Sequence, residues 1–121
     1  MNQKQLSGKE GEKLALEYLK GKGFSPLGSH YWTRYGELDL IMEDEGTVVF
    51  VEVKRRNSDT YGEPEEAVTP FKRNHLARAA LMYIKERNLF EKAIRFDVVS
   101  VGPEGIKHFT DALEFQTDFY Y

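Results

Sequence analysis

The feature that most restricts the fold of this chain is a segment, residues 36–54, whose residue pattern is that of two paired β-strands. The expected arms are Gly36–Met42 and Thr47–Lys54, joined by the polar turn Glu43–Gly46. The second arm carries apolar residues on both of its faces, as strands buried on both sides do. The segment therefore predicts a β-hairpin that runs through the core of the protein.

The side chains of Asp39, Glu52 and Lys54 are expected on one face of this hairpin, because side chains alternate along a strand. In the register that the turn favours, Glu37 lies opposite Glu52 and Asp39 lies diagonal to it, roughly 5 to 8 Å apart at Cβ. Like charges that face each other destabilise a sheet, so a bound cation is the natural explanation. The alternative, a solvated polar face, fits poorly on a strand that is apolar on both sides.

A further acidic residue breaks the pattern of a helix near the start of the chain. Ser7 and Glu10 form a capping box, and the helix is expected to end near Gly21–Gly23. The residues expected to face inward are Gly11, Leu14, Ala15, Tyr18 and Leu19. Glu12 projects to the same inner side, where a carboxylate needs a partner or must lose its charge. It either reaches water at the boundary or joins the hairpin carboxylates at a metal site.

A second helix is expected to begin with Thr69 as its N-cap and Pro70 as its first residue, and to run to about Asn88. Lys72 falls on the inner side of its first turn, where a positive charge opposes the helix dipole and needs an anion nearby. Two interpretations of Lys72 remain open. Its ammonium reaches solvent past the helix end, or it reaches the carboxylate patch or a substrate phosphate.

Further strands are expected within residues 24–35, 93–102 and 106–109, so the elements follow the order α-β-β-β-α-β-β. This order predicts an α/β fold, a mixed β-sheet flanked by helices. The length fits a single domain, residues 1–114, followed by an aromatic tail at residues 115–121. We expect this tail to contribute to a homodimer contact, and the alternative is that it folds back onto the chain's own core.

Composition restricts which cellular compartment and which class of partner are expected. The polar start Met1–Gln5 and the lack of a long apolar run indicate neither a signal peptide nor a membrane span. The absence of cysteine suits a reducing environment, so we expect a cytoplasmic protein without a membrane partner. The net charge of −3 argues against a general nucleic-acid coat protein, but an acidic metal-dependent nuclease is compatible with it.

The chemistry best supported by these residues is metal-assisted hydrolysis of a phosphodiester. Asp39, Glu52 and Glu12 offer hard oxygen ligands, which select Mg²⁺ or Mn²⁺. Lys54 would emerge at the edge of the metal and orient water or stabilise negative charge. The three histidines, His30, His75 and His108, have no ligand-like spacing and are expected to be structural or exposed. Asp97 is expected to pair locally with Arg95.

The spacing of Asp39 from Glu52-Val53-Lys54 resembles the PD-(D/E)xK nuclease signature, with Glu12 as the acid on the preceding helix. More narrowly, the chain over residues 8–114 is similar to the bacterial YraN-like family, which is related to archaeal Holliday-junction resolvases. The segments that carry this likeness are Gly36–Ile41, Val49–Lys54, Ala67–Val68 with Lys72, and Arg95–Asp97. The resemblance implies a restriction-endonuclease-like fold and structure-selective cleavage of DNA.

The function expected from residues and resemblance together is a Mg²⁺- or Mn²⁺-dependent endonuclease that acts on DNA rather than RNA, on branched or Holliday-junction-like substrates. The residues expected to contact nucleic acid are Arg55, Arg56, Lys72 and Arg73, and Glu37 is expected to support the site. One alternative is a catalytically weak nucleic-acid-binding accessory module of recombination or repair. Another is a protein-interaction domain whose acidic patch is only structural.

Overall fold

The computed structural model describes residues 8–56 and 68–113. The described residues form, in chain order, α1 (Gly8–Gly21), β1 (Ser25–Thr33), β2 (Gly36–Asp44), β3 (Thr47–Arg55), α3 (Pro70–Arg87), β4 (Ile94–Gly102) and β5 (Gly105–Phe109). The predicted fold, a mixed sheet flanked by helices in this order, is confirmed. The expected cap at Ser7 and the aromatic tail at 115–121 lie outside the described residues.

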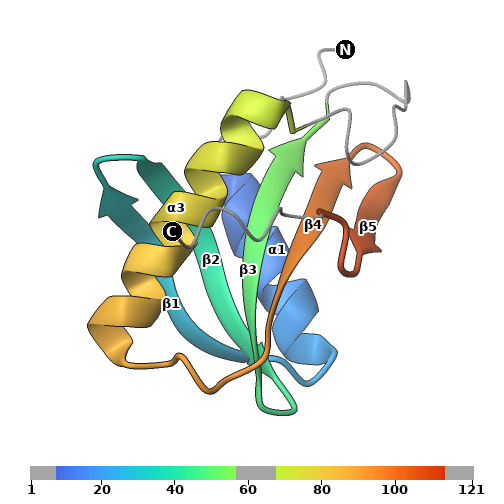
Figure 1. The fold of residues 1–121 in the computed structure, drawn as a ribbon. Helices are drawn as coiled ribbons and strands as arrows, with labels where there is room; N and C mark the ends of the chain where they lie inside the picture. Colours follow the sequence, from blue (N-terminus) through green and yellow to red (C-terminus); the bar gives the residue numbers. More distant parts are fainter. Residues whose placement is uncertain (1–7, 57–67, 114–121) are drawn as a thin grey trace.

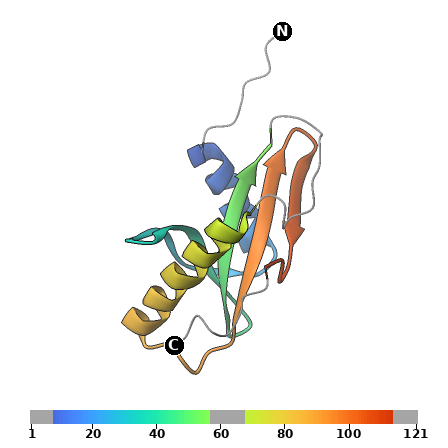
Figure 2. The ribbon, with the colours of Figure 1, turned by 45° about the horizontal axis from the view of Figure 1, so that its top comes forward.

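The five strands form one sheet in the order β1-β2-β3-β4-β5. β3 and β4 run parallel, and the other neighbouring strands run antiparallel. Parallel neighbours need a long crossover connection, and α3 lies within it. Figures 1 and 2 show α3 across one face of the sheet and α1 across the other, so the fold has three layers. Neither described helix has the length and apolar character that a membrane crossing requires.

The central strand β3 supplies core residues to both faces of the sheet, as its sequence predicts. Val48 and Phe50 pack beneath α3, where the Phe50 ring stacks on that of Phe96 with centroids 5.2 Å apart. Val49 and Val51 pack beneath α1 on the opposite face. Burial on both faces makes the middle of β3 a rigid support for the residues at its end.

The two helices end where the sequence predicts, with one error in the inner face of α1. Gly11, Ala15 and Leu19 are buried, but Leu14, which was expected to face inward, is 43% exposed. A Cβ atom at Gly11 would lie 2.8 Å from Arg55 Cγ. The small residues therefore bring α1 so close to the sheet that its buried stripe is narrow, and Leu14 falls outside it.

The predicted start and end of α3 are both correct. The hydroxyl of Thr69 accepts a hydrogen bond from the backbone N–H of Lys72, with N and Oγ1 3.1 Å apart. Pro70 follows as the first helical residue, and Asn88 ends the helix in the left-handed conformation, with φ of 56°. This cap fixes the first turn of α3, which carries Lys72, beside the sheet.

The predicted register of the hairpin is wrong by two residues. β2 continues to Asp44, and only Glu45 and Gly46 form the turn, with φ angles of 50° and 87°. Positive φ at both central residues is the requirement of a tight type I′ turn, which the longer polar turn expected from the sequence did not anticipate. Asp44 therefore pairs with Thr47. Asp39 rather than Glu37 comes level with Glu52.

Candidate functional site

The site lies where the ladder between β2 and β3 ends. Leu40 and Val51 are the last paired residues, and beyond them the two strands diverge (Figure 1). The backbone N–H of Val53 then donates to the side chain of Asp39, with N and Oδ2 3.0 Å apart. The Asp39 carboxylate thus takes the place of the backbone carbonyl that would accept this bond if the ladder continued. The bond holds Asp39 at the fork, the point where β2 and β3 diverge.

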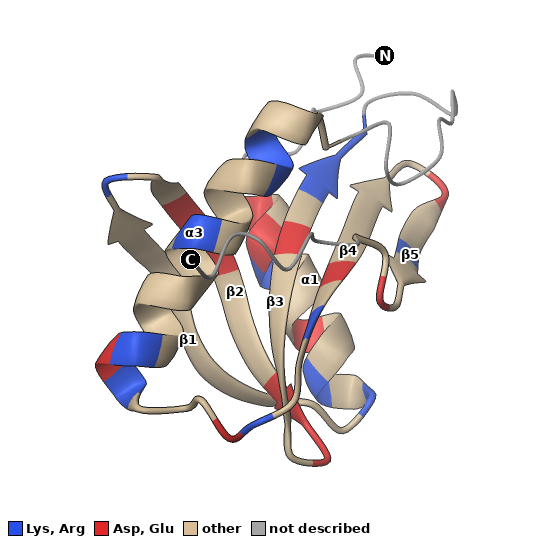
Figure 3. Ribbon diagram, in the orientation of Figure 1, with Lys and Arg blue, Asp and Glu red and all other residues tan. Residues whose placement is uncertain are grey.

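A cavity of about 330 Å³ opens at this fork. Among its lining residues are six that the sequence predicts for the site: Glu12, Asp39, Glu52, Lys54, Arg55 and Lys72. They come from α1, β2, β3 and the first turn of α3, and Figure 3 shows the acidic and basic positions of these elements side by side. The tertiary structure brings these residues together, and their roles stay predictions.

Glu52 is the most constrained residue of the cavity. Its side chain is 5% exposed, and Oε2 lies 3.1 Å from Lys72 Nζ and 3.9 Å from Lys54 Nζ. Its other oxygen, Oε1, is buried and has no hydrogen-bond partner among the described residues. Burial, followed by the negative charge of Asp39, raises the pKa of Glu52 to about 7, although Lys72 opposes this shift.

Lys72 reaches the carboxylates rather than turning away from them, which decides between its two interpretations. Burial alone would lower the pKa of its ammonium, but the contact with Glu52 raises it. The side chain remains 47% exposed. The Lys72 ammonium therefore partly offsets the negative charge of Glu52 and is still accessible from the cavity.

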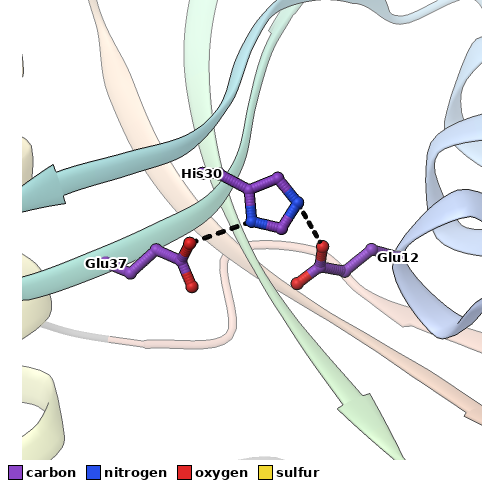
Figure 4. A group of neighbouring side chains, drawn as sticks. All are labelled: Glu12, His30 and Glu37. Atoms are coloured by element: carbon purple, nitrogen blue, oxygen red, sulfur yellow. Dashed lines mark hydrogen bonds and ion pairs between the residues drawn. The ribbon is translucent and has the colours of Figure 1, made fainter. Parts of the chain in front are cut away.

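Glu12 lies at the margin of the cavity, in contact with a histidine that the sequence did not assign to the site. His30 Nε2 lies 2.7 Å from Glu12 Oε1, without the alignment of a hydrogen bond. His30 Nδ1 lies 2.9 Å from Glu37 Oε2 on the other side of the ring (Figure 4). The contact with Glu37 raises the pKa of His30. Burial and then Asp39 raise the pKa of Glu12, while His30 counteracts this.

A carboxylate therefore meets each ring nitrogen of His30, which is an arrangement suited to a protonated imidazole. The donor atoms of the three residues lie within 4.8 Å of one another, which is also compact enough for a cation. Glu37 pairs with Trp32 on β1, and the register of β2 with β3 does not place it opposite Glu52, so its expected position is corrected. No spacing in the sequence signals this group, because β1 has to fold beside β2 and α1 before His30 meets the two acids.

The predicted basic residues divide into two groups. Arg55 is exposed and lines the cavity together with Lys72. Arg73 is half-buried, and its Nε donates to the carbonyl of Val68, with N and O 3.2 Å apart. Arg56 is partly buried near Gly102, where an added Cβ would lie 3.2 Å from Arg56 Cβ. Neither Arg56 nor Arg73 lines the cavity.

Asp97 has the structural role that its neighbour suggested. Its Oδ1 lies 3.0 Å from Arg95 Nε and 2.9 Å from the backbone N of Asp111, and its Oδ2 lies 2.7 Å from His108 Nε2. Burial alone would raise the pKa of Asp97, but these partners lower it. The partners account for both carboxylate oxygens, so this acid anchors β4 and β5.

The fold and the cavity define an α/β protein with an acidic, lysine-flanked site at a fork between two strands. Residues 11–101 match the model of the uncharacterised protein family UPF0102, and the chain belongs to that family. A UPF0102 protein of Syntrophomonas wolfei is 48% identical over 106 residues, 84% of this chain and 92% of the relative. A UPF0102 protein of Syntrophus aciditrophicus is 43% identical over 94% of this chain and 93% of its own.

Among solved structures, the crystal structure of SSO0001 overlaps with a TM-score of 0.44 at 18% identity. The overlap covers 87% of this chain and 50% of that chain. The match to the UPF0102 family model and to these relatives confirms the YraN-like resemblance at the level of the family.

Proposed function

We propose that this chain is a metal-dependent endonuclease of the PD-(D/E)xK superfamily that hydrolyses phosphodiester bonds in DNA, with branched DNA as the expected substrate. The observation that carries the proposal is the state of Glu52. A buried acid with a purely structural role would have partners for both oxygens, as Asp97 has. Glu52 instead leaves Oε1 without a partner, next to Asp39 and at the wall of an open cavity.

The residues present fit a small divalent cation. Asp39 and Glu52 would supply hard carboxylate oxygens, and Glu12 would approach from the margin, which suits Mg²⁺ or Mn²⁺. A bound cation would offset the two effects that raise the pKa of Glu52, its burial and the negative charge of Asp39. Such an ion, when bound, lowers the pKa of its water and offsets charge on a phosphate.

The remaining side chains of the cavity have roles that depend on their charge and position. Lys54 is 33% exposed and 3.9 Å from Glu52, so its ammonium can orient water or offset negative charge that develops on a phosphate. The hydrogen bond that the backbone N–H of Val53 donates keeps the Asp39 carboxylate in place. Arg55 and Lys72 provide positive charge for the phosphates of a DNA strand.

One observation favours a second candidate function. Lys72 Nζ lies 3.1 Å from Glu52, so the chain itself supplies a cation for this carboxylate. If that ion pair persists beside DNA, the protein would bind nucleic acid with little catalysis, as an accessory module of recombination or repair.

The test compares cleavage of labelled four-way-junction, flap and linear DNA in Mg²⁺ or Mn²⁺. Asp39→Asn, Glu52→Gln and Lys54→Ala should each lower the rate at least ~100-fold, because they remove groups that act in the transition state. Glu17→Gln, on the exposed face of α1, is the matched control and should cut normally. Asp39→Asn should also weaken Mn²⁺ binding in calorimetry, and Lys54→Ala should do so much less.

Two outcomes would contradict the proposal. Wild-type cleavage by Asp39→Asn and Glu52→Gln, in a preparation free of contaminating nuclease, would remove the assigned site. Binding of DNA by the wild-type protein without cleavage under any metal would favour the accessory module instead.

A further inference from the structure

A ring that the proposed chemistry does not use stands exposed beside the acidic cavity. Phe71, in the first turn of α3, is 74% exposed. Its centroid lies 4.3 Å from that of His75, with the ring planes inclined by 42°. The His75 ring is fixed in turn, because its Nδ1 lies 2.6 Å from the carbonyl oxygen of Tyr35. One face of Phe71 therefore rests on a fixed support while most of the ring remains open to solvent.

These rings line a second cavity that adjoins the first. Tyr35, Phe71 and His75 line a space of about 220 Å³, and Asp39 and Lys72 line both this space and the acidic cavity. Pockets that enclose a drug-sized ligand span roughly 300–1,000 Å³, so this space suits a single planar ring system. Figures 1 and 2 show the first turn of α3, in yellow-green, beside the end of β3.

Three basic side chains lie beside the rings, as a nucleic-acid strand would require. The guanidinium carbons of Arg34 and Arg78 lie 5.0 Å and 5.7 Å from the centre of the Tyr35 ring. Lys72 stands on the side of the acidic cavity. Glu37 also lines the space, but it is in contact with His30. Aromatic rings with cations around them are the combination by which proteins hold single-stranded nucleic acid.

We infer that Phe71, His75 and Tyr35 form an aromatic shelf whose exposed ring, that of Phe71, stacks on an unpaired base of a DNA strand. This inference rests on the proposed function and names its substrate class. Because the shelf and the acidic cavity share Asp39 and Lys72, the stacked base belongs to a nucleotide next to the phosphate that is cleaved. Both faces of a paired base are covered by its neighbours in a duplex. The substrate is therefore DNA with an unpaired nucleotide beside the cut.

The test measures binding without cleavage, in Ca²⁺ and at one fixed salt concentration, because phosphate contacts depend on salt. The probes are a fully paired duplex and the same duplex with one unpaired 2-aminopurine, and anisotropy gives Kd for each. Phe71→Ala should weaken binding to the unpaired probe about tenfold and leave the paired duplex unchanged. Phe71→Tyr should bind as the wild type does, and 2-aminopurine fluorescence should be quenched only where residue 71 is aromatic.

Phe90→Ala is the matched control, since Phe90 is 61% exposed and lies beyond the other end of α3. Equal affinities of Phe71→Ala and Phe90→Ala for the unpaired probe would overturn the shelf. The shelf would also be overturned if Phe71→Ala changed only the oligomeric state, because the Phe71 ring would then belong to a protein contact. Glu52-dependent cleavage with no preference for unpaired DNA would reject the shelf and leave the nuclease intact. Stacking without Glu52-dependent cleavage would support the shelf and reject the nuclease.

Discussion

At the scale of single residues, two buried acids on neighbouring strands show how their partners set the pKa of a carboxylate. Asp97 is fully buried, yet its pKa is lowered, because side-chain and backbone donors satisfy both of its oxygens. Glu52 is almost as buried, and its pKa is raised to about 7. Its neighbours are a second acid and two lysines that reach only one oxygen. The difference lies in the partners and not in the depth of burial.

The raised pKa of Glu52 predicts a dependence of stability on pH. Between its ordinary value of 4.5 and about 7, the folded protein binds the proton of Glu52 more tightly than the unfolded chain does. The contribution of Glu52 to stability should therefore be largest below pH 4.5 and fall as pH rises through about 7, by about 3 kcal/mol. Glu52→Gln, which cannot ionise, should lack this loss and be the more stable protein at about pH 8.

Urea unfolding in a chelating buffer at about pH 4.5 and about pH 8 measures the effect. Glu17→Gln is the control, because Glu17 is 62% exposed and its removal should leave the pH profile of the wild type. Parallel pH profiles for wild type and Glu52→Gln would show that Glu52 ionises normally in the folded protein.

At the scale of elements, the turn between β2 and β3 decides which residues form the site. A turn of two residues pairs Asp44 with Thr47. A turn of four, as the sequence suggested, would pair Met42 with Thr47 and place Glu37 across from Glu52. The side chains would still alternate faces after such a shift of two, but a different acid would enter the cavity. The turn and the last residues of the ladder therefore select Asp39.

This turn holds a residue that is poorly suited to it. Glu45 adopts φ of 50°, a conformation that costs little for asparagine or glycine and more for other residues. Glu45→Asn should therefore raise the free energy of unfolding by about 0.5 kcal/mol, whereas Gly46→Ala should lower it by about 1 kcal/mol. Thermal and urea unfolding of the three proteins give the measurement. A loss of stability in Glu45→Asn would indicate that the Glu45 side chain makes a contact worth more than the strain.

At the scale of the whole molecule, a net charge of −3 coexists with basic residues collected around one cavity. Both α3 and the end of β3 contribute to this collection, and Figure 3 shows their basic positions on the same side as the acids. Long-range attraction of DNA is weak for such a protein, so the proposed binding would have to come from local phosphate contacts. Its affinity should therefore depend steeply on salt.

The corresponding prediction concerns Arg55, which is exposed and lines the cavity. Arg55→Ala should weaken DNA binding and reduce the slope of log Kd against log salt by about one, because one phosphate contact is lost. Lys20→Ala, at the far end of α1, should leave the slope unchanged. Titrations of branched DNA in Ca²⁺ at several salt concentrations supply the slopes. An affinity that is the same in low and moderate salt would contradict this location of the DNA-binding surface.

Sequence patterns alone predicted the order of elements, the strand buried on both faces and the ends of α3, and they singled out Glu12, Asp39, Glu52 and Lys54, which the fold places around one cavity. Periodicity and capping are local properties, so a chain with no partner yet in place already contains them. The sequence left two interpretations of Lys72 open, because the position of a residue in a helix fixes the direction of its side chain but not the groups that the side chain contacts.

Three features follow from packing between distant parts of the chain: the register of the hairpin, the contact of Lys72 with Glu52, and the contacts of His30 with Glu12 and Glu37. The same holds for the aromatic shelf, whose rings come from the first turns of α3 and the segment before β2. Each of these depends on the distance between residues that are remote in the chain. Such distances are set by packing across the sheet, which no local pattern encodes.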